Sequence, residues 1–402
     1  SCGMNNTDFL IIGGGIIGLS IARILKKRFS DSRVILIEKE EGVGFHGSGR
    51  NSGVLHAGFY YSSDSLKAKF TRTGNQRLTE YCESRGLKIN KCGKLVVAKN
   101  EEELQRFNEL LERGKKNGVP LQCLTEVEAR EIEPRVKTFE KALYSPSTAT
   151  IDPLEVIMAM QKDAKDEGVD IHLGTGYLRA QGNRVSTSSG SYEARMVINA
   201  GGLYADKIAM DFGFSRKYRI LPFKGLYLNS DEPPGSLRTN IYPVPDLRNP
   251  FLGTHFTVTV AGKTKIGPTA IPALWREQYQ GMKNLCWSEM LEILARQCGL
   301  FISSNFNFKA LACEEIRKRS RPHLVALASS LAEGVELNNY RTWGKPGIRA
   351  QLINIEERKL EMDFVIEGDQ DSIHVLNAVS PAFTCALPFA EYVCDHVARH
   401  VS

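Results

Sequence analysis

The chain has 402 residues, of which 42% are hydrophobic and 24% are charged, and its formal net charge at pH 7 is +6. This composition is typical of a globular protein large enough for two domains, and the mild positive charge suits an acidic substrate without indicating nucleic-acid binding. The nine cysteines form no CxxC pair and no histidine lies at a zinc-site spacing, so we expect reduced thiols and no metal.

The longest apolar run near the start covers residues 9–19 and contains three consecutive glycines. It is too short to cross a bilayer, and it lacks the basic stretch and the cleavage site of a secretory signal. We therefore expect a cytoplasmic protein that is peripheral to the inner membrane at most. If the source is eukaryotic and a targeting peptide has been removed, we expect a mitochondrial protein.

An apolar run over residues 8–13 predicts a buried parallel strand that leads directly into a glycine-rich turn, and residues 19–28 then predict a helix. Glycines in such a turn permit a tight bend, close approach of the backbone to a pyrophosphate, and close contact between helix and strand. The three glycines are Gly13, Gly15 and Gly18.

A second apolar run, over residues 33–38, ends on Glu38, about twenty residues after the last glycine of the turn. A carboxylate at this distance can accept hydrogen bonds from ribose hydroxyls. The complete series of strand, turn, helix, strand and acid predicts dinucleotide binding, in preference to a turn that merely packs a strand against a helix.

Three later segments are suited to contact the same cofactor. Residues 42–53 are rich in glycine, serine and hydrogen-bond donors, residues 196–200 predict a second buried strand, and residues 377–384 precede an amphipathic helix predicted over 385–401, with Pro388 in its first turn. Small residues there would let a flat cofactor ring approach, and the helix N-terminus could stabilise negative charge on the ring. Besides Glu38 and the three glycines, the cofactor-binding candidates are Lys39, Ser48, Arg50, Asn51, Ser52, Gly53, Ala200, Gly201, Ser380, Ala382 and Thr384.

Six further segments carry a resemblance to a known family: residues 50–58, 92–95, 221–225, 240–246, 251–257 and 267–269. With the glycine turn, they resemble the D-amino-acid oxidase-like superfamily of FAD enzymes, and within it the L-2-hydroxyglutarate dehydrogenases and oxidases. The resemblance implies FAD as cofactor, oxidation of a small 2-hydroxy dicarboxylate by hydride transfer to the flavin, and oxygen or a quinone as electron acceptor. The product of L-2-hydroxyglutarate would be 2-oxoglutarate.

The predicted fold class is α/β, with a Rossmann-like FAD-binding domain of the D-amino-acid oxidase (GR2) type. It is interleaved with an α+β substrate domain built on a mostly antiparallel sheet, in which we expect charged amphipathic helices around residues 101–117 and a hairpin of strands 256–261 and 263–267. The FAD-binding domain should consist of residues 4–80, 145–215 and 342–402, and the substrate domain of residues 81–144 and 216–341.

Oxidation of a secondary alcohol requires a base that takes the hydroxyl proton while a hydride leaves the adjacent carbon. His56 is the favoured base, because an imidazole titrates near pH 6.5 and this one lies in a segment that matches the family. The alternative is that His56 only binds backbone or cofactor. His255, in another matching segment, is the competing base.

A dicarboxylate substrate requires cations, and an arginine can bind a planar carboxylate through two parallel hydrogen bonds. The substrate-binding candidates are Tyr60, Tyr61, Arg219, Lys224, Tyr242, Arg276 and Arg349. Two other classes of function stay open. One is an FAD-dependent amino-acid or amine oxidase, or an enzyme similar to glycerol-3-phosphate dehydrogenase, and the other is a flavoprotein without substrate chemistry.

Overall fold

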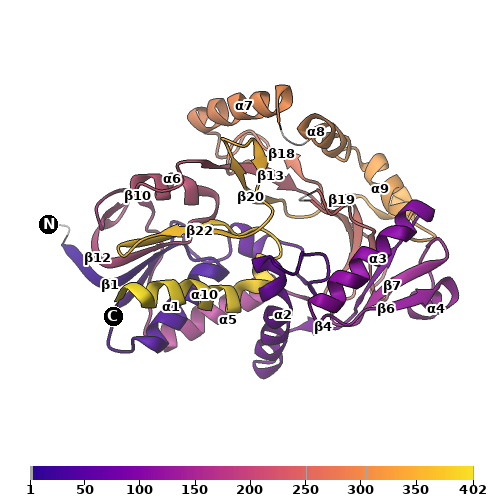
Figure 1. The fold of residues 1–402 in the computed structure, drawn as a ribbon, viewed down its shortest axis with the longest axis horizontal. Coiled ribbons are helices and arrows are strands. Elements are labelled where there is room, and N and C mark those ends of the chain that lie inside the picture. Colours follow the sequence, from indigo (N-terminus) through magenta and orange to yellow (C-terminus); the bar gives the residue numbers. More distant parts are fainter. Residues whose placement is uncertain (1–2, 250, 305–306, 402) are drawn as a thin grey trace.

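The computed structural model describes residues 3–249, 251–304 and 307–401 of the chain. These residues form one mostly parallel sheet, one mostly antiparallel sheet and two smaller sheets. Figure 1 shows the first strand, β1 (Met4–Ile12), near the last helix, α10 (Ala382–Val401). The two ends of the chain therefore build the same part of the molecule.

The parallel sheet is built around β1. Its strands, in order, are β10 (Tyr177–Gln181), β11 (Arg184–Thr187), β12 (Gly190–Asn199), β1, β2 (Val34–Ile37) and β9 (Asp170–His172), with β23 (Ser372–Asn377) beside β12 and β22 (Val365–Gly368) beside β23. Phe9 and Ile11 belong to one hydrophobic cluster, whereas Leu10 and Ile12 belong to another. Because both faces of β1 are covered at its C-terminal end, residues 9–12 are continuously apolar and do not alternate.

Helices cover the parallel sheet on both sides: α1 (Ile16–Arg28), α5 (Pro153–Asp166) and α10 pack together below it in Figure 1, and α6 (Ala205–Asp211) lies above. Helix α1 begins at Ile16, earlier than the predicted residue 19. Gly18 therefore lies inside the helix. A Cβ there would be 1.9 Å from the carbonyl oxygen of Gly13, so the helix can begin this close to the glycine turn because residue 18 has no side chain.

Helix α10 begins at Ala382, not at the predicted residue 385, so Pro388 lies inside the helix beyond its first turn. Pro388 has no N–H to donate to the carbonyl of Thr384, one turn earlier. That carbonyl lies against α2 (Leu66–Ser84), where a Cβ on Gly74 would be only 2.0 Å from it. Close packing of the two helices therefore accompanies the proline.

The antiparallel sheet contains, in order, β19 (Thr342–Trp343), β14 (Leu228–Asn229), β17 (Thr264–Gly267), β16 (His255–Val258), β15 (Asn240–Pro243), β5 (Lys94–Val97), β7 (Lys141–Ser145) and β6 (Gln122–Thr125). The predicted hairpin is confirmed as β16 and β17, although its strands are shorter because residues 259–263 form the turn. The other helices are α3 (Glu101–Lys116), α4 (Glu126–Ile132), α7 (Trp287–Ile302), α8 (Phe308–Arg317) and α9 (Arg321–Ser329), with short 3-10 turns η1 (Gly47–Gly49), η2 (Gly202–Tyr204) and η3 (Leu337–Asn339). None of the helices in the described ranges combines the length and apolarity needed to cross a membrane.

The two smaller sheets bear on one predicted domain boundary, at residue 342. The first contains β18 (Ile271–Pro272), β13 (Tyr218–Gly225), β20 (Gly347–Asn354) and β21 (Lys359–Leu360), and the second contains β3 (Val54–Leu55), β8 (Ala149–Ile151) and β4 (Ile89–Asn90). Strand β20 pairs along its full length with β13, and β19 pairs with β14. These hydrogen bonds connect strands of the predicted FAD-binding domain with strands of the predicted substrate domain, and the boundary at residue 342 stays a prediction.

Candidate active site

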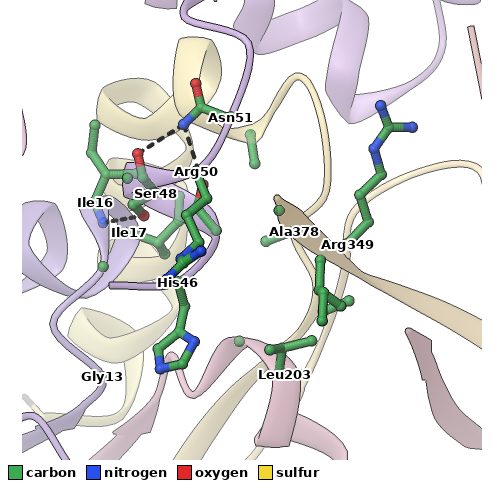
Figure 2. A pocket seen from close by; sticks show the side chains of 18 of the residues that line it. Gly13, Ile16, Ile17, His46, Ser48, Arg50, Asn51, Leu203, Arg349 and Ala378 are labelled. Carbon is green, nitrogen blue, oxygen red and sulfur yellow. Dashed lines mark hydrogen bonds between the residues drawn. The ribbon is translucent and has the colours of Figure 1, made fainter. Parts of the chain in front are cut away.

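A cavity of about 990 Å³ lies between the parallel sheet and the strands β17 and β20. Its walls come from segments that are far apart in the chain: the turn after β1, the loop at residues 44–52, the end of β12, β20, and the residues before α10. Figure 2 shows Ser48 and Asn51 on one side of this space and Arg349 on the other. The volume lies at the upper end of the usual range for small-molecule sites, as a dinucleotide requires.

The turn after β1 leaves no room for side chains. Gly13 has a φ of +109°, and a Cβ there would lie 2.2 Å from the carbonyl oxygen of Ala200. A Cβ on Gly15 would lie 3.0 Å from Ser48 Oγ, which accepts a hydrogen bond of 2.9 Å from the N–H of Ile16. The turn is therefore a cradle at the N-terminus of a helix, a place that attracts phosphate.

Glu38 lies on the cavity wall at the end of β2. Its carboxylate accepts hydrogen bonds from the N–H groups of Gly14 (3.1 Å) and Glu40 (2.8 Å), which hold it beside the glycine turn. Carboxylate oxygens have further lone pairs, so hydroxyls of a ribose could still donate to this group.

The loop after Glu38 is held by its own polar groups. The Asn51 amide donates to the carbonyls of Gly47 (3.2 Å) and Ser48 (2.8 Å), and the Arg50 guanidinium lies 4.0 Å from the centre of the Tyr279 ring. Because these contacts already fix the loop, it loses little conformational entropy when its remaining polar groups bind a ligand in the cavity.

Most of the predicted cofactor-binding residues line the cavity: Gly13, Gly15, Gly18, Glu38, Lys39, Ser48, Arg50, Asn51, Ser52, Ala200, Gly201, Ser380, Ala382 and Thr384. Gly53 does not line it. There the φ is +78°, and a Cβ would be 2.5 Å from the carbonyl oxygen of Ile151. Gly53 therefore shapes the loop from behind.

His56 follows β3, lines the cavity and is 7% exposed. Its backbone N–H donates to Thr384 Oγ1 (3.2 Å), which fixes it beside the start of α10. Burial, together with the charges of Lys94, Arg349 and Lys67, lowers its pKa to about 3. The expected titration near pH 6.5 is therefore wrong for this environment, and His56 is a neutral imidazole whose ring nitrogens have no hydrogen-bond partner among the described residues.

His255 does not line the cavity. Its Nδ1 lies 3.0 Å from the carbonyl oxygen of Gly253, and its ring stacks on Tyr242 with ring centres 3.7 Å apart. Burial lowers its pKa well below the usual value, and Nε2 has no hydrogen-bond partner in the described ranges. This geometry gives His56 the better access to a substrate in the cavity.

Four cations gather at this end of the cavity without an ion pair in the described part of the chain: Lys67, Lys94, Lys265 and Arg349. Burial lowers the pKa of Lys94 to about 7 and that of Lys67 and Lys265 to about 8. Burying several charges of one sign is unfavourable unless an anion joins them. The arrangement therefore predicts an anionic ligand.

The three predicted tyrosines lie just behind the cavity wall and do not line it. The ring centres of Tyr60 and Tyr242 are 4.4 Å and 4.3 Å from Lys94 Nζ, and the Tyr61 ring is 5.8 Å from Lys67 Nζ. They therefore contact the cations of the site and leave Arg349 and Lys265 on the wall itself.

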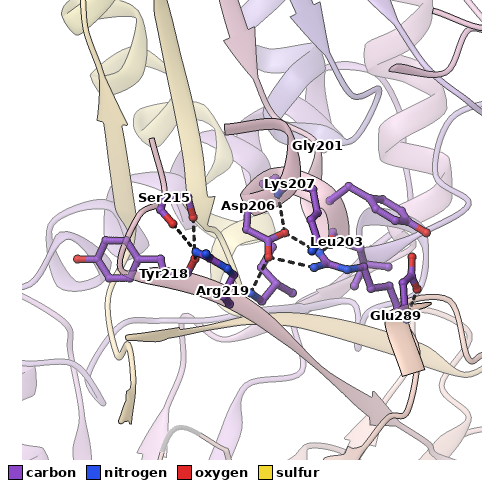
Figure 3. Close-up of polar contacts among 12 residues, drawn as sticks. Gly201, Leu203, Asp206, Lys207, Ser215, Tyr218, Arg219 and Glu289 are labelled. Carbon is purple, nitrogen blue, oxygen red and sulfur yellow. Dashed lines mark hydrogen bonds and ion pairs between the residues drawn. The ribbon is translucent and has the colours of Figure 1, made fainter. Parts of the chain in front are cut away.

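The other three predicted substrate ligands, Arg219, Lys224 and Arg276, do not reach the cavity. Figure 3 shows the Arg219 guanidinium turned toward Ser215 and Tyr218, to whose carbonyls it donates at 2.6 Å and 2.7 Å. Arg276 is buried and bound to both carboxylate oxygens of Asp206, at 2.6 Å and 3.0 Å. The two arginines are engaged inside the protein, so the structure corrects these assignments.

Replacing Arg276 with Met is expected to lower the free energy of unfolding by about 3–5 kcal/mol, because it leaves the buried Asp206 carboxylate without its cation. The matched control is Arg23→Met, whose pair with Glu167 is partly exposed and should contribute only about 0–1 kcal/mol. Denaturant unfolding of both variants measures this. Equal small losses would mean that the Arg276 pair has no structural role.

Sequence reasoning missed the lysines of the site. Lys94 directly precedes the apolar run 95–97, and Lys265 lies between apolar or small neighbours in β17. A lysine in a strand that is otherwise buried is the signal that could have indicated them, since lysine is rarely buried without a reason.

The site combines a glycine cradle for a dinucleotide with a buried cationic pocket and a neutral histidine. This combination is typical of a flavin-dependent oxidoreductase. The family model described as FAD dependent oxidoreductase matches residues 8–396, and the chain belongs to this family. The FAD predicted from the sequence is thereby confirmed as the cofactor, and so is the interleaved fold of the D-amino-acid oxidase type.

Curated relatives of similar length narrow the family further. The L-2-hydroxyglutarate dehydrogenase of Escherichia coli K12 is 34% identical over 97% of this chain and 93% of its own, and the mitochondrial one of Nematostella vectensis is 36% identical over 98% and 90%. The human mitochondrial enzyme of that name is 31% identical over 99% and 90%. The chain thus belongs with the L-2-hydroxyglutarate dehydrogenases in this family.

Solved structures agree on the fold. The L-alpha-glycerophosphate oxidase of Mycoplasma pneumoniae with FAD bound has a TM-score of 0.79 at 22% identity, covering 98% of this chain and 95% of that one. The glycine oxidase of Geobacillus kaustophilus has a TM-score of 0.73 at 19% identity, covering 99% and 96%.

Proposed function

We propose that this protein oxidises L-2-hydroxyglutarate to 2-oxoglutarate with FAD as cofactor. The observation that carries the proposal is a group of four cations at the His56 end of the cavity, next to the dinucleotide cradle, that form no ion pair with any described residue. A substrate with two carboxylates would compensate such a group, whereas an amino acid brings a further positive charge to it. The names of the curated relatives support the same substrate.

Different residues of the chain have different roles in the reaction. FAD, when bound along the glycine turn, supplies the acceptor for the hydride. Arg349, on the cavity wall, would bind the carboxylate next to the reacting carbon, and His56 would take the hydroxyl proton on a ring nitrogen. His56 itself is buried, and a charged contact at a buried group is stronger than the same contact in water.

The test is turnover by the purified holoenzyme of L- and D-2-hydroxyglutarate, lactate, glycerol 3-phosphate and sarcosine. We expect the highest kcat/KM with L-2-hydroxyglutarate. A higher value for sarcosine or glycerol 3-phosphate would assign the protein to another activity of the same fold.

Replacing Arg349 with Gln is expected to raise the KM for L-2-hydroxyglutarate about 10- to 100-fold, because a charged hydrogen-bond partner of a carboxylate is lost. Arg219→Gln is the matched control, since its guanidinium binds backbone carbonyls outside the cavity, and its KM should stay within about twofold. Steady-state kinetics of both variants measures the two KM values. A larger effect in Arg219→Gln would restore that residue as the substrate ligand.

For the electron acceptor we propose oxygen or a membrane quinone. The exposed apolar residues of α7, namely Trp287, Leu291 and Ile302, support peripheral contact with a membrane, because such groups gain by leaving water. Flotation of the holoenzyme with phosphatidylglycerol vesicles tests that contact, and protein that stays at the bottom of the gradient would speak against it.

A further inference from the structure

Behind the cavity wall, Lys94 lies in an aromatic chamber formed by Phe59, Tyr60 and Tyr242. Lys94 is 1% exposed, and its Nζ lies 4.9 Å, 4.4 Å and 4.3 Å from the centres of these three rings. Within the described ranges, its ammonium has neither an ion pair nor a hydrogen bond. The faces of aromatic rings stabilise a buried cation only in part, so the Lys94 ammonium still needs an anionic partner.

Other polar atoms of the same chamber also lack partners. The hydroxyls of Tyr60 and Tyr242 are buried without a hydrogen bond to any residue that the structure describes, and so is Nε2 of His255, whose ring stacks on Tyr242. Buried polar atoms without partners are rare in proteins and call for an explanation. An ammonium and two hydroxyls are all hydrogen-bond donors, and a carboxylate is a ligand that only accepts.

The chamber adjoins the reaction site. The charge of Lys94 lowers the pKa of both His56 and His255, so it acts on the catalytic end of the cavity. Arg349 lines the cavity, whereas Lys94 lies behind its wall, close enough to His56 for its charge to lower the pKa of that imidazole. The two carboxylates of a five-carbon diacid are separated by three carbons and need two separate cationic sites.

We propose that Lys94, with the hydroxyls of Tyr60 and Tyr242, binds the distal carboxylate of the substrate and thereby selects dicarboxylates over monocarboxylates. This role rests on the proposed function, because it assigns one end of that substrate. It makes Lys94 a specificity-determining residue, while His56 and Arg349 act at the reacting carbon.

The test uses the FAD-loaded Lys94→Met variant. We expect the ratio of kcat/KM for L-2-hydroxyglutarate to that for L-2-hydroxybutyrate to fall about 10- to 100-fold, since only the first substrate has a distal carboxylate. Lys224→Met is the matched control, because Lys224, unlike Lys94, is not among the charges that lower the pKa of His56 or His255, and its ratio should stay within about twofold of the wild type.

A second variant and a binding measurement keep the proposal testable even if Lys94→Met misfolds. Tyr242→Phe keeps the ring and removes the hydroxyl, and the same ratio should fall about 10- to 100-fold, the effect of one hydrogen bond to a charged group. Binding of glutarate, followed through the flavin absorbance, should weaken in both variants, whereas binding of butyrate should change less. If Lys94→Met does not retain FAD, the Tyr242→Phe results decide.

The outcomes separate the two proposals. A wild-type enzyme that neither oxidises L-2-hydroxyglutarate nor binds glutarate overturns the proposed function, and the role of Lys94 with it. If the wild type does both, but the variants keep its substrate ratio and its glutarate affinity, only the role of the chamber is overturned.

Discussion

The Gly15→Val variant is expected to fold but to be purified without FAD. A Cβ at this position would already lie 3.0 Å from Ser48 Oγ, and the two further methyl groups of valine would extend into the space along the start of α1. That space is where the backbone must approach a pyrophosphate closely. The ratio of flavin absorbance to protein absorbance should therefore drop to near zero.

The control for this experiment is Gly299→Val in α7, where no atom lies within 4 Å of the added Cβ. This variant should keep a full complement of FAD. Circular dichroism of Gly15→Val separates loss of cofactor from loss of fold. Stoichiometric FAD in a folded Gly15→Val protein would show that the cofactor binds elsewhere.

The His56→Ala variant is expected to keep its FAD but to reduce it about 10²- to 10⁴-fold more slowly with L-2-hydroxyglutarate, the usual contribution of a positioned base. The cradle and Glu38 do not depend on the His56 side chain, so cofactor binding should survive. Stopped-flow mixing under anaerobic conditions measures the rate.

The pH profile of His56→Ala distinguishes a base from a packing residue. Because the pKa of His56 is lowered to about 3, its base form is present at all pH values above this, and the loss should be the same from pH 6 to pH 8. His255→Ala is the comparison, since that ring is hidden behind Tyr242. A fast His56→Ala together with a slow His255→Ala would move the base to His255.

The cofactor half of the site could be predicted because its pattern is local. The glycines of the turn, Glu38 and the loop after it lie within about forty residues of one another, and their spacing alone indicates a dinucleotide. The structure places nearly all of these residues on the cavity wall.

The substrate half depends on contacts between distant segments. Arg219 and Arg276 looked like Arg349 in the sequence, but the partners that engage them, Ser215 and Asp206, are set by the packing of β13 and α6. Lys94 becomes part of the site only when β5 pairs with β15 and brings Tyr242 beside it. No local pattern predicts such pairings.

The predicted domain boundary at residue 342 depends on contacts of the same kind. Residues 347–354 follow the substrate segment and precede the last strands of the FAD-binding domain, so their position in the chain suits either domain. They pair with residues 218–225, and strand pairing over such a separation is not encoded in either strand alone.

Anaerobic titration of the holoenzyme with L-2-hydroxyglutarate tests whether this substrate reduces the flavin. We expect that the flavin absorbance bleaches fully after one equivalent of substrate per flavin, that one equivalent of 2-oxoglutarate appears, and that D-2-hydroxyglutarate leaves the flavin oxidised. A flavin that stays oxidised with L-2-hydroxyglutarate, or that bleaches without 2-oxoglutarate being formed, would contradict this expectation.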